Sequence, residues 1–379
     1  MSAQAGYVSL GRSGLVTAAL SALTGERQDM PARALVWCLV PLAVLYSMGL
    51  KAYLSLYAIG VRRRRRLASC VVSVGNIVSG GTGKTALTVS LAGGLRERGV
   101  RVAILSRGYK GGCRAQVLVV STYDSICAGA ADAGDEPFLM ATLLPGVPVL
   151  VGRDRRKTGA EAIRRFGPDV LLLDDGMQFY QLHRDLEIVL VSGVRPFGNG
   201  WTLPAGVLRE PPSHLSRASF VVVSGADARD AERRLGSLGL KAPILRAAYN
   251  PTHIEVAGAG ERLNVSVLAG TPVASFCALG APVAFEATVE SLGARIVRRH
   301  RLPDHACLSA EQLSRIAADA AGLEARALVT SAKDAVKLPP ARLPLPIWVL
   351  HAEYKLDGMD ELLNQVYGAV SLRSRRGAE

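Results

Sequence analysis

The chain has 379 residues, of which 49% are hydrophobic and 20% are charged, a composition typical of folded rather than disordered proteins. This length is enough for two ordinary domains. The six cysteines are scattered without a C-x-x-C pair, which excludes a cysteine zinc site of that kind, argues against a disulfide framework and favours a reducing compartment. The net charge of +13 leaves three kinds of partner open, namely nucleic acid, a membrane surface or an anionic substrate.

More than half of the excess positive charge lies before residue 67, where nine basic residues face two acidic ones, a balance of +7. Residues 34–61 are nearly all apolar or aromatic apart from Lys51, and five consecutive arginines follow at 62–66. The segment could span the bilayer or lie in its interface, and in both cases the arginines belong beside anionic headgroups on the cytoplasmic side. We interpret residues 1–66 as a membrane anchor; the alternative is a buried core helix followed by a solvated basic linker.

Residues 71–85 read VVSVGNIVSGGTGKT, an apolar run that leads through a glycine-rich turn into a helical pattern. This strand, loop and helix order is the layout of a phosphate-binding P-loop, although Val78 stands where the usual pattern has its first glycine. The glycines let amides approach phosphate oxygens, Lys84 can reach the β- and γ-phosphates, and Thr85 offers a hydroxyl to Mg²⁺. The predicted nucleotide-binding residues are Val78, Ser79, Gly80, Gly81, Thr82, Gly83, Lys84 and Thr85.

Short apolar runs alternate with amphipathic segments from residue 67 to about 225. The predicted strands are 70–74, 102–105, 117–120, 149–151, 170–173, 188–191 and 220–223, with helices that include 136–144 and 155–166. Continuous apolar strands separated by helices are typical of a parallel sheet covered on both faces. We therefore predict an α/β fold, with a P-loop NTPase-type domain at residues 67–240.

A second, smaller α/β domain is predicted at residues 261–379. Its strands are expected at 274–279, 295–297, 327–330 and 347–350, and its helices at 283–292, 310–321 and 359–366. Between the two domains, at 241–260, two short extended segments flank Tyr249-Asn250-Pro251 and read as a connector.

Carboxylates occupy two positions where an α/β protein places ligands. Asp174 and Asp175 end the apolar strand 170–173, where a P-loop protein carries its magnesium-binding acid, and Asp174 is preferred. Asp135 precedes a helix, and two interpretations stay open for it: a helix N-cap, or a carboxylate presented to an acceptor hydroxyl.

The Gly/Pro-rich stretch 195–211 has the composition of a lid or binding loop, with a surface excursion as the alternative. The isolated histidines, His253 and His351 among them, are expected to be surface or hydrogen-bonding residues.

Taken in order, these segments resemble the tetraacyldisaccharide 4′-kinases, the membrane-bound enzymes that phosphorylate the lipid A precursor. The resemblance covers about residues 30–370 and rests on VGNIVSGGTGKT, SRGYKG, GDEPFLMA, LLLDDGMQ, DLEIVLV, RPFGNGWTLPAGVLREP, PDH and SAKDAVKL. Two departures are Val207, where the family has proline, and Ser331-Ala332, which replace the usual Thr-Glu.

The resemblance implies roles for particular residues of this chain. Asp135 would be the general base, helped by His305, while Lys84 stabilises charge on the transferred phosphate. Asp174 and Asp175, with Thr85, would be the magnesium ligands. Tyr109, Arg209 and Glu210 match positions that contact substrate or support catalysis.

The implied reaction transfers the γ-phosphate of ATP, with Mg²⁺, to the 4′-hydroxyl of an acylated glucosamine disaccharide 1-phosphate. The implied location is the cytoplasmic face of a bacterial inner membrane, with a lipid surface as partner, no nucleic acid and no obligate protein partner. The alternative is a membrane-associated P-loop ATPase switch without a lipid acceptor. A nucleic-acid-binding protein is disfavoured, because no recognisable module accompanies the charge.

Overall fold

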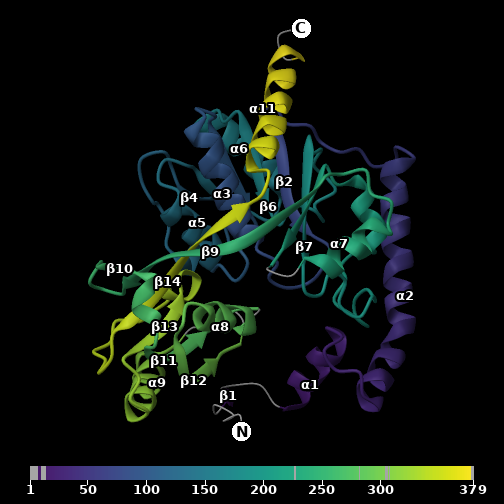
Figure 1. Cartoon of the computed structure of the whole chain (residues 1–379). Coiled ribbons are helices and arrows are strands. Elements are labelled where there is room, and N and C mark those ends of the chain that lie inside the picture. The colour runs from purple at the N-terminus through teal and green to yellow at the C-terminus, as the bar shows by residue number, and fades with distance from the viewer. Residues whose placement is uncertain are drawn as a thin grey trace. The chain divides into compact units, whose positions relative to one another are not determined.

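The alternation of strands and helices expected from the sequence is present in the computed structural model, which describes residues 7–9, 14–225, 228–280, 282–303, 306 and 308–376. The chain divides into two compact units: one comprises residues 14–248 and 354–379, here called the P-loop unit, and the other comprises residues 1–13 and 249–353, here called the second unit. Strands β9 (Ile244–Val256) and β14 (Ile347–Leu356) carry the chain from one unit to the other (Figure 1).

The P-loop unit is built on a mostly parallel sheet whose strands run in the order β9-β8-β7-β2-β6-β3-β5-β4. Its remaining strands are β2 (Cys70–Asn76), β3 (Val102–Ser106), β4 (Leu118–Ser121), β5 (Val149–Val151), β6 (Val170–Asp174), β7 (Leu186–Ser192) and β8 (Phe220–Ser224). Each strand predicted for the P-loop domain is present. The edge strand β4 differs from the parallel expectation, because it pairs antiparallel with β5.

Helices cover both faces of this sheet, because alternate side chains of each buried strand point to opposite sides. The helices of the unit are α1 (Gly14–Leu23), α2 (Met30–Ala58), α3 (Lys84–Glu97), α4 (Ala130–Ala133), α5 (Asp135–Leu143), α6 (Arg155–Phe166), α7 (Arg229–Gly236) and α11 (Met359–Arg376), with a 3₁₀ turn η1 (Pro212–Arg217). Val72 packs with α3, α5 and α11 on one face, and Val71 packs with α6 on the other.

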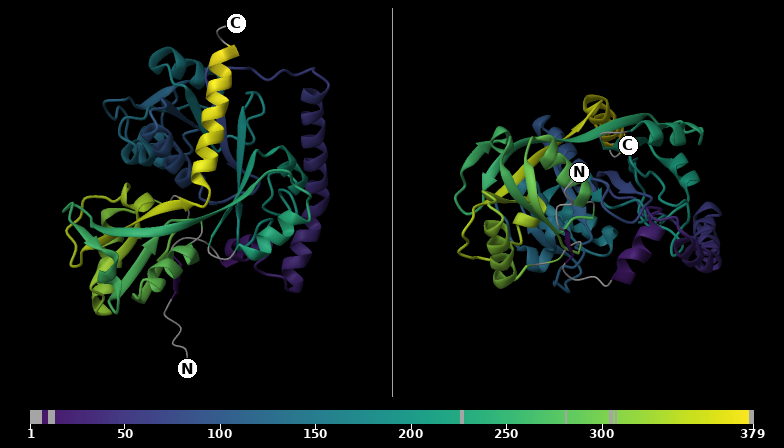
Figure 2. Two further views of the ribbon diagram at one scale, coloured as in Figure 1. Left: turned by 45° about the horizontal axis from the view of Figure 1, so that its top comes forward. Right: turned by 60° about the horizontal axis from the view of Figure 1, so that its bottom comes forward.

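The C-terminal helix α11 groups with the P-loop unit, whereas the sequence suggests that residues 261–379 form one domain. Leu362, Leu363 and Val366 are buried in the same cluster as Leu91 of α3, and the two helices lie side by side (Figure 1, Figure 2). Burial of its apolar side chains therefore places α11 in the P-loop unit, because its hydrophobic face packs on the sheet of that unit.

In the second unit the strands follow the order β1-β12-β11-β13-β14-β9 and are again mostly parallel, with β10 pairing antiparallel to β9. Its elements are β1 (Tyr7–Ser9), β10 (Arg262–Asn264), η2 (Val265–Leu268), β11 (Pro272–Cys277), α8 (Pro282–Ser291), β12 (Arg295–Arg301), α9 (Ala310–Gly322), β13 (Ala327–Ser331) and α10 (Ala332–Ala335). Phe276 packs with α9 on one face, while Val273 packs with α8 on the other.

The prediction that the connector consists of two short extended segments is wrong, although these residues do lead from one unit to the other. Residues 244–256 form the single strand β9, which runs through Asn250 and Pro251. Proline breaks helices but has a fixed φ that an extended strand tolerates, and it lacks only the N–H of one ladder bond.

Replacing Leu91 by Ala should lower the free energy of unfolding of the P-loop unit by about 2–5 kcal/mol, because this side chain of α3 is fully buried against the sheet. Thermal or denaturant unfolding measures the change. The matched control is Leu143→Ala on α5, where the side chain is 43% exposed and the loss should stay near 0.5 kcal/mol. Equal losses in the two variants would contradict the assigned core.

Candidate active site

The glycine-rich loop leads directly into helix α3, whose first residue is Lys84. Gly83 is the N-cap, with φ of 90° and no side-chain capping bond, so the first amides of α3 are left for an anion. A Cβ at Gly83 would also lie 3.0 Å from the hydroxyl of Tyr354. Both the backbone angle and the close approach therefore require glycine here.

Asn76, at the end of β2, fixes the shape of the loop. Its fully buried amide donates hydrogen bonds to the hydroxyl of Thr82 at 3.0 Å and to the carbonyl of Gly80 at 3.4 Å. The carbonyl of Asn76 in turn accepts a bond from Gln178 at 3.0 Å. The sequence had left Asn76 without a role, and the structure shows that it holds the loop.

Lys84 points toward the carboxyl end of β6. Its Nζ donates to the carbonyl of Gly80 at 3.4 Å and lies 3.7 Å from Oδ1 of Asp175. The predicted cation and one of the predicted acids are thus brought together by parallel strands whose carboxyl ends share an edge of the sheet.

Asp174 is buried at the end of β6, where the hydroxyl of Ser106 lies 3.5 Å from its Oδ2. Burial, then the charges of Glu136 and Asp175, raise the pKa of Asp174 to about 7. Its Oδ1 is buried and has no hydrogen-bond partner among the residues that the structure describes. A buried carboxylate oxygen without a partner is the chemistry that a hard cation such as Mg²⁺ satisfies, so Asp174 fits a magnesium ligand.

The pKa of Asp175 is shifted in the opposite direction. Although partial burial would raise its pKa, Lys84 and Arg209 hold that pKa below its ordinary value. The Nη1 of Arg209 lies 2.9 Å and 3.0 Å from the two carboxylate oxygens. Asp175 adopts a left-handed backbone with φ of 52°, which turns its side chain out of the strand toward these cations.

The predicted binding loop 195–211 is bonded to the base of the P-loop. The amide of Ser79 donates to the carbonyl of Val207, and the amide of Arg209 donates to the carbonyl of Ile77, each at 2.7 Å. A surface excursion is therefore excluded, because backbone bonds bring this loop beside the nucleotide loop and place Arg209 there.

Glu210 is fully buried beneath Arg209. Its carboxylate lies 2.8 Å from Nδ1 of His214 and 2.7 Å from Nη1 of Arg217, and it accepts a bond from Gln178 at 2.9 Å. Burial opposes ionisation, but the bonds from His214 and Arg217 prevail and lower the pKa of Glu210 to about 2. Glu210 thus anchors the loop that carries Arg209.

The N-cap interpretation of Asp135 is wrong. Gly134 is the cap, with φ of 89°, and Asp135 is the first residue of α5. A Cβ at position 134 would lie 2.6 Å from the carbonyl oxygen of Tyr109, so only glycine fits where these loops pack together. Asp135 is half-buried, Tyr109 is exposed, and His305 lies outside the described residues.

The sequence analysis missed two charged groups near Asp174. Arg155, the first residue of α6, is buried, donates to the carbonyl of Asp174 at 3.3 Å, and has its pKa lowered to about 10 by burial. Glu136 of α5 lies close enough to raise the pKa of Asp174. Arg155 follows β5 by a few residues, so its place after a strand end was the signal that could have found it.

The site combines a P-loop that leads into a free helix N-terminus, a buried acid at the end of the neighbouring strand β6, and two cations close by. This combination defines a P-loop phosphotransferase site. A match to the family described as Tetraacyldisaccharide-1-P 4′-kinase spans residues 35–370. The chain belongs to this family.

Individual relatives agree with this assignment. The tetraacyldisaccharide 4′-kinase of Syntrophus aciditrophicus (strain SB) is 39% identical over 345 residues, which cover 88% of this chain and 92% of that protein. The enzyme of the same name from Anaeromyxobacter dehalogenans (strain 2CP-C) is 41% identical over 294 residues, 76% of this chain and 77% of that protein.

A solved structure agrees as well. The "apo" form of LpxK from Aquifex aeolicus, in complex with ATP, superposes with a TM-score of 0.71 at 30% identity, covering 89% of this chain and 99% of that one. The predicted fold class and the predicted kinase activity of this family are therefore confirmed.

Replacing Glu210 by Gln should lower the free energy of unfolding by about 3 kcal/mol near neutral pH, because Arg217 and His214 lose a buried anionic partner. Since folding depresses the pKa of Glu210, its contribution is complete above the ordinary glutamate range, near 4.3, and is lost as pH falls toward about 2. The wild-type and variant melting curves should therefore converge in acid.

The control for this prediction is Glu97→Gln, an exposed acid on α3, which should leave the pH dependence of melting unchanged. If the difference in melting temperature between wild type and Glu210→Gln stayed constant as the pH was lowered into the acid range, the assigned ion pairs would be contradicted.

Proposed function

We propose that this chain transfers the γ-phosphate of ATP to the 4′-hydroxyl of a tetraacyldisaccharide 1-phosphate and forms the 1,4′-bisphosphate. The observation that carries the proposal is the convergence of Lys84 and Arg209 on Asp175 beside the uncapped N-terminus of α3. Transfer of a phosphoryl group depends mainly on positioning and on stabilising negative charge, and this arrangement gathers both cations and free amides for that purpose.

ATP would lie on residues 78–85, with Lys84 against the terminal phosphates. Thr85, Asp174 and Asp175 would hold Mg²⁺, which supplies neutralisation of phosphate charge when bound. Asp174 is the stronger direct ligand because one of its oxygens lacks a partner among the described residues, whereas Asp175 is occupied by Lys84 and Arg209. Asp175 therefore serves first to orient the two cations.

Asp135 would accept the proton of the attacking hydroxyl, and His305 would support it. Two features favour Asp135: it is half-buried, and it begins a helix directly after the Gly134 turn, so that it is held in place. Arg209 and Tyr109 would contact substrate, and Glu210 would act by holding Arg209 in position from beneath.

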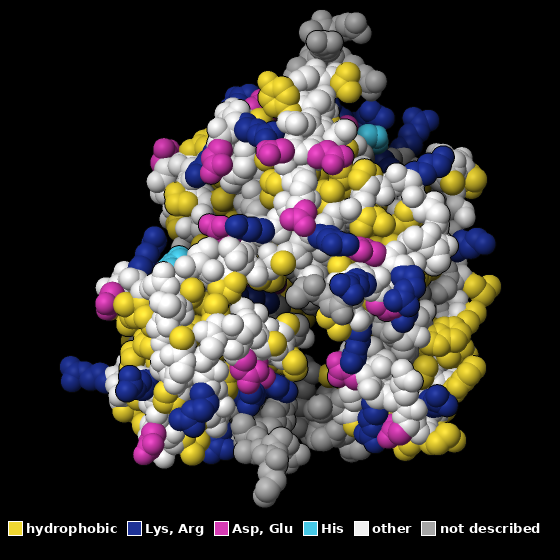
Figure 3. Space-filling view, in the orientation of Figure 1, with side chains coloured by type: hydrophobic (Ala, Val, Ile, Leu, Met, Phe, Trp, Pro, Cys, Tyr) yellow, Lys and Arg dark blue, Asp and Glu magenta, His cyan; other side chains and the backbone are white. Residues whose placement is uncertain are grey.

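Helix α2 would bring the enzyme to its lipid substrate. It is long and apolar enough to cross a membrane, and little of it is buried. Its large exposed apolar side chains include Met30, Leu35, Trp37, Leu42, Val44, Leu45 and Met48. In Figure 3 hydrophobic side chains gather along the right edge, where α2 lies in Figure 1.

The opposite side of α2 packs on the P-loop unit over several turns. The hydroxyl of Thr202 donates to the carbonyl of Ala43 at 3.2 Å, and the hydroxyl of Tyr46 donates to the carbonyl of Arg209 at 2.8 Å. Further along, the ring of Tyr53 lies 6.0 Å from that of Tyr180. Because protein occupies one side over this length, α2 would lie in the interface with its apolar side in lipid, rather than span the bilayer.

This orientation suits a substrate whose acyl chains stay in the membrane. A cavity of about 220 Å³ between α2 and Trp201 is lined mainly by apolar side chains, together with Ser47, Thr202 and Lys51. We place the enzyme at the cytoplasmic face of the bacterial inner membrane, where ATP is available, and we expect neither nucleic acid nor an obligate protein partner to be required.

The test of the proposed reaction is incubation of purified protein with γ-labelled ATP, Mg²⁺ and a tetraacyldisaccharide 1-phosphate in detergent micelles. Label should appear in the lipid at the 4′ position. Release of labelled inorganic phosphate without labelled lipid would instead support the ATPase-switch alternative.

In the same assay, Lys84→Ala should reduce the rate more than Asp135→Asn does. Lys84 acts on charge that develops in the transition state, whereas general-base catalysis contributes roughly 10²–10⁴-fold. Arg153→Ala, an exposed arginine, is the control and should retain the wild-type rate. Negligible effects of both Lys84→Ala and Asp135→Asn would contradict the assigned roles.

Replacing the five arginines 62–66 by glutamine should weaken binding to vesicles that contain anionic lipid by at least tenfold, since each near-surface arginine contributes about 1 kcal/mol. Vesicle flotation at low salt measures the change. A variant with five lysines keeps the charge and should bind like wild type; unchanged binding of the glutamine variant would contradict the electrostatic role.

A further inference from the structure

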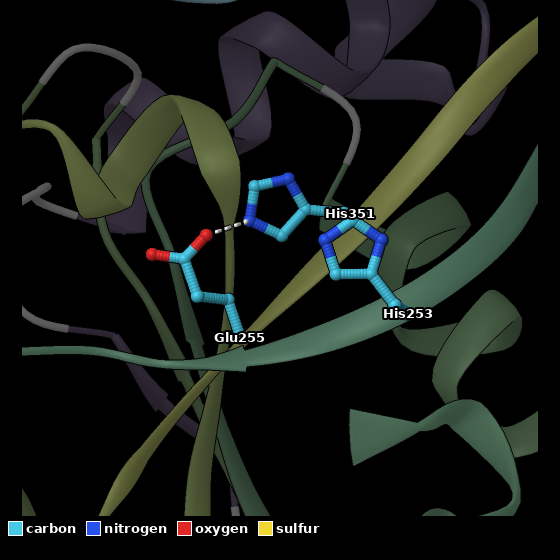
Figure 4. A group of neighbouring side chains, drawn as sticks. All are labelled: His253, Glu255 and His351. Carbon is cyan, nitrogen blue, oxygen red and sulfur yellow. Dashed lines mark ion pairs between the residues drawn. The ribbon is translucent and has the colours of Figure 1, made fainter. Parts of the chain in front are cut away.

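A cluster of metal-ligating side chains lies entirely within the second unit, apart from the kinase site. His253 and Glu255 are two residues apart on β9, so their side chains emerge on the same face of the strand, and His351 comes from the neighbouring strand β14 (Figure 4). One ligand atom from each of the three lies within 4.8 Å of the others. The two imidazole rings stack, with centroids 4.5 Å apart and an interplanar angle of 7°.

The hydroxyl of Thr252 contacts both histidines of the cluster. The hydroxyl of Thr252 donates its single proton to the carbonyl oxygen of His351 at 3.3 Å. The same hydroxyl lies 3.0 Å from Nδ1 of His253, and when its proton is on that carbonyl it accepts a bond from this nitrogen. In that arrangement the neutral His253 ring carries its proton on Nδ1, and Nε2 bears the lone pair that binds a metal.

That Nε2 atom is buried and has no hydrogen-bond partner among the residues that the structure describes. Leaving a buried lone pair unsatisfied costs free energy, and a metal ion would satisfy it. A protein hydrogen bond already orients the opposite side of the ring, which is the arrangement that histidine ligands of metals commonly have.

The other two side chains complete a suitable ligand set. Nε2 of His351 lies 3.2 Å from Oε2 of Glu255, so these two donor atoms already face each other. Arg262 of β10 lies opposite Glu255 in the strand register. Glu255 supplies the negative charge that offsets it.

We propose that His253, Glu255 and His351 bind a divalent transition-metal ion of the zinc type and thereby join β9 to β14. Two imidazoles and one carboxylate suit zinc better than magnesium, which prefers oxygen ligands throughout. The side chains of His351 and Glu255 are 21% and 37% exposed, so water can reach the remaining coordination position.

Binding requires only side-chain movement. At zinc–ligand distances of about 2.0–2.2 Å, tetrahedral ligand atoms lie roughly 3.4 Å apart, so the present separations must shorten by about 1 Å or less on average. Rotation of the stacked rings about their χ angles achieves this, and the ring stack should open when metal binds.

The test is a Co²⁺ titration of the untagged full-length protein in detergent, stripped with chelator and held in excess Mg²⁺ to occupy oxygen-ligand sites. Visible absorption of a low-symmetry Co²⁺ complex should rise to one equivalent per chain and disappear on addition of Zn²⁺. Zn²⁺ should also raise the melting temperature of the second unit.

Variants separate this site from adventitious binding. His253→Gln and His351→Gln should each weaken Co²⁺ binding at least tenfold, and Thr252→Val, which removes the orienting hydroxyl, about tenfold. His183→Gln, which removes a partly buried histidine of the P-loop unit, is the matched control and should bind like wild type. Absence of a Co²⁺ spectrum in wild type, or an unchanged titration in His253→Gln and His351→Gln, would overturn the proposal.

Discussion

The active site depends on one carboxylate that is shared by two cations. Lys84 and Arg209 come from segments more than a hundred residues apart and would repel each other without Asp175. The left-handed backbone of Asp175 turns its carboxylate toward both of them. Because the preceding residue keeps the regular strand conformation, Asp174 points to a different, buried environment. The pKa values of these two adjacent acids are thus shifted in opposite directions. Asp175 orients the two cations, and the buried Asp174 is suited to be a metal ligand.

Arg209 also connects the P-loop to the apolar helix α2. Its amide bonds to Ile77 at the base of the P-loop, its guanidinium bonds to Asp175, and its carbonyl accepts a bond from Tyr46 of α2. Glu210 fixes the same stretch from beneath through buried ion pairs. These contacts together fix the position of the loop, which therefore supports both the apolar helix α2 and the nucleotide loop.

The two metal sites that we propose differ in the chemistry of their donors. The P-loop unit offers carboxylate and hydroxyl oxygens, which suit Mg²⁺, whereas the second unit places two imidazole nitrogens beside one carboxylate. The cysteine pattern excluded zinc fingers of the C-x-x-C kind, but histidine ligands on neighbouring strands leave no comparable spacing in the sequence. Such a site is visible only when strand pairing is known.

The sequence by itself determined the P-loop, the order of strands and helices, and the family. These features depend on residues that are close together in the sequence, namely glycines that permit unusual backbone angles and apolar residues that recur with the period of a strand or helix. The tertiary structure decided the rest: that Gly134 rather than Asp135 caps α5, that residues 244–256 form one strand, and that His253 meets His351. Each of these depends on contacts between segments distant in sequence, where packing and electrostatics override local preference.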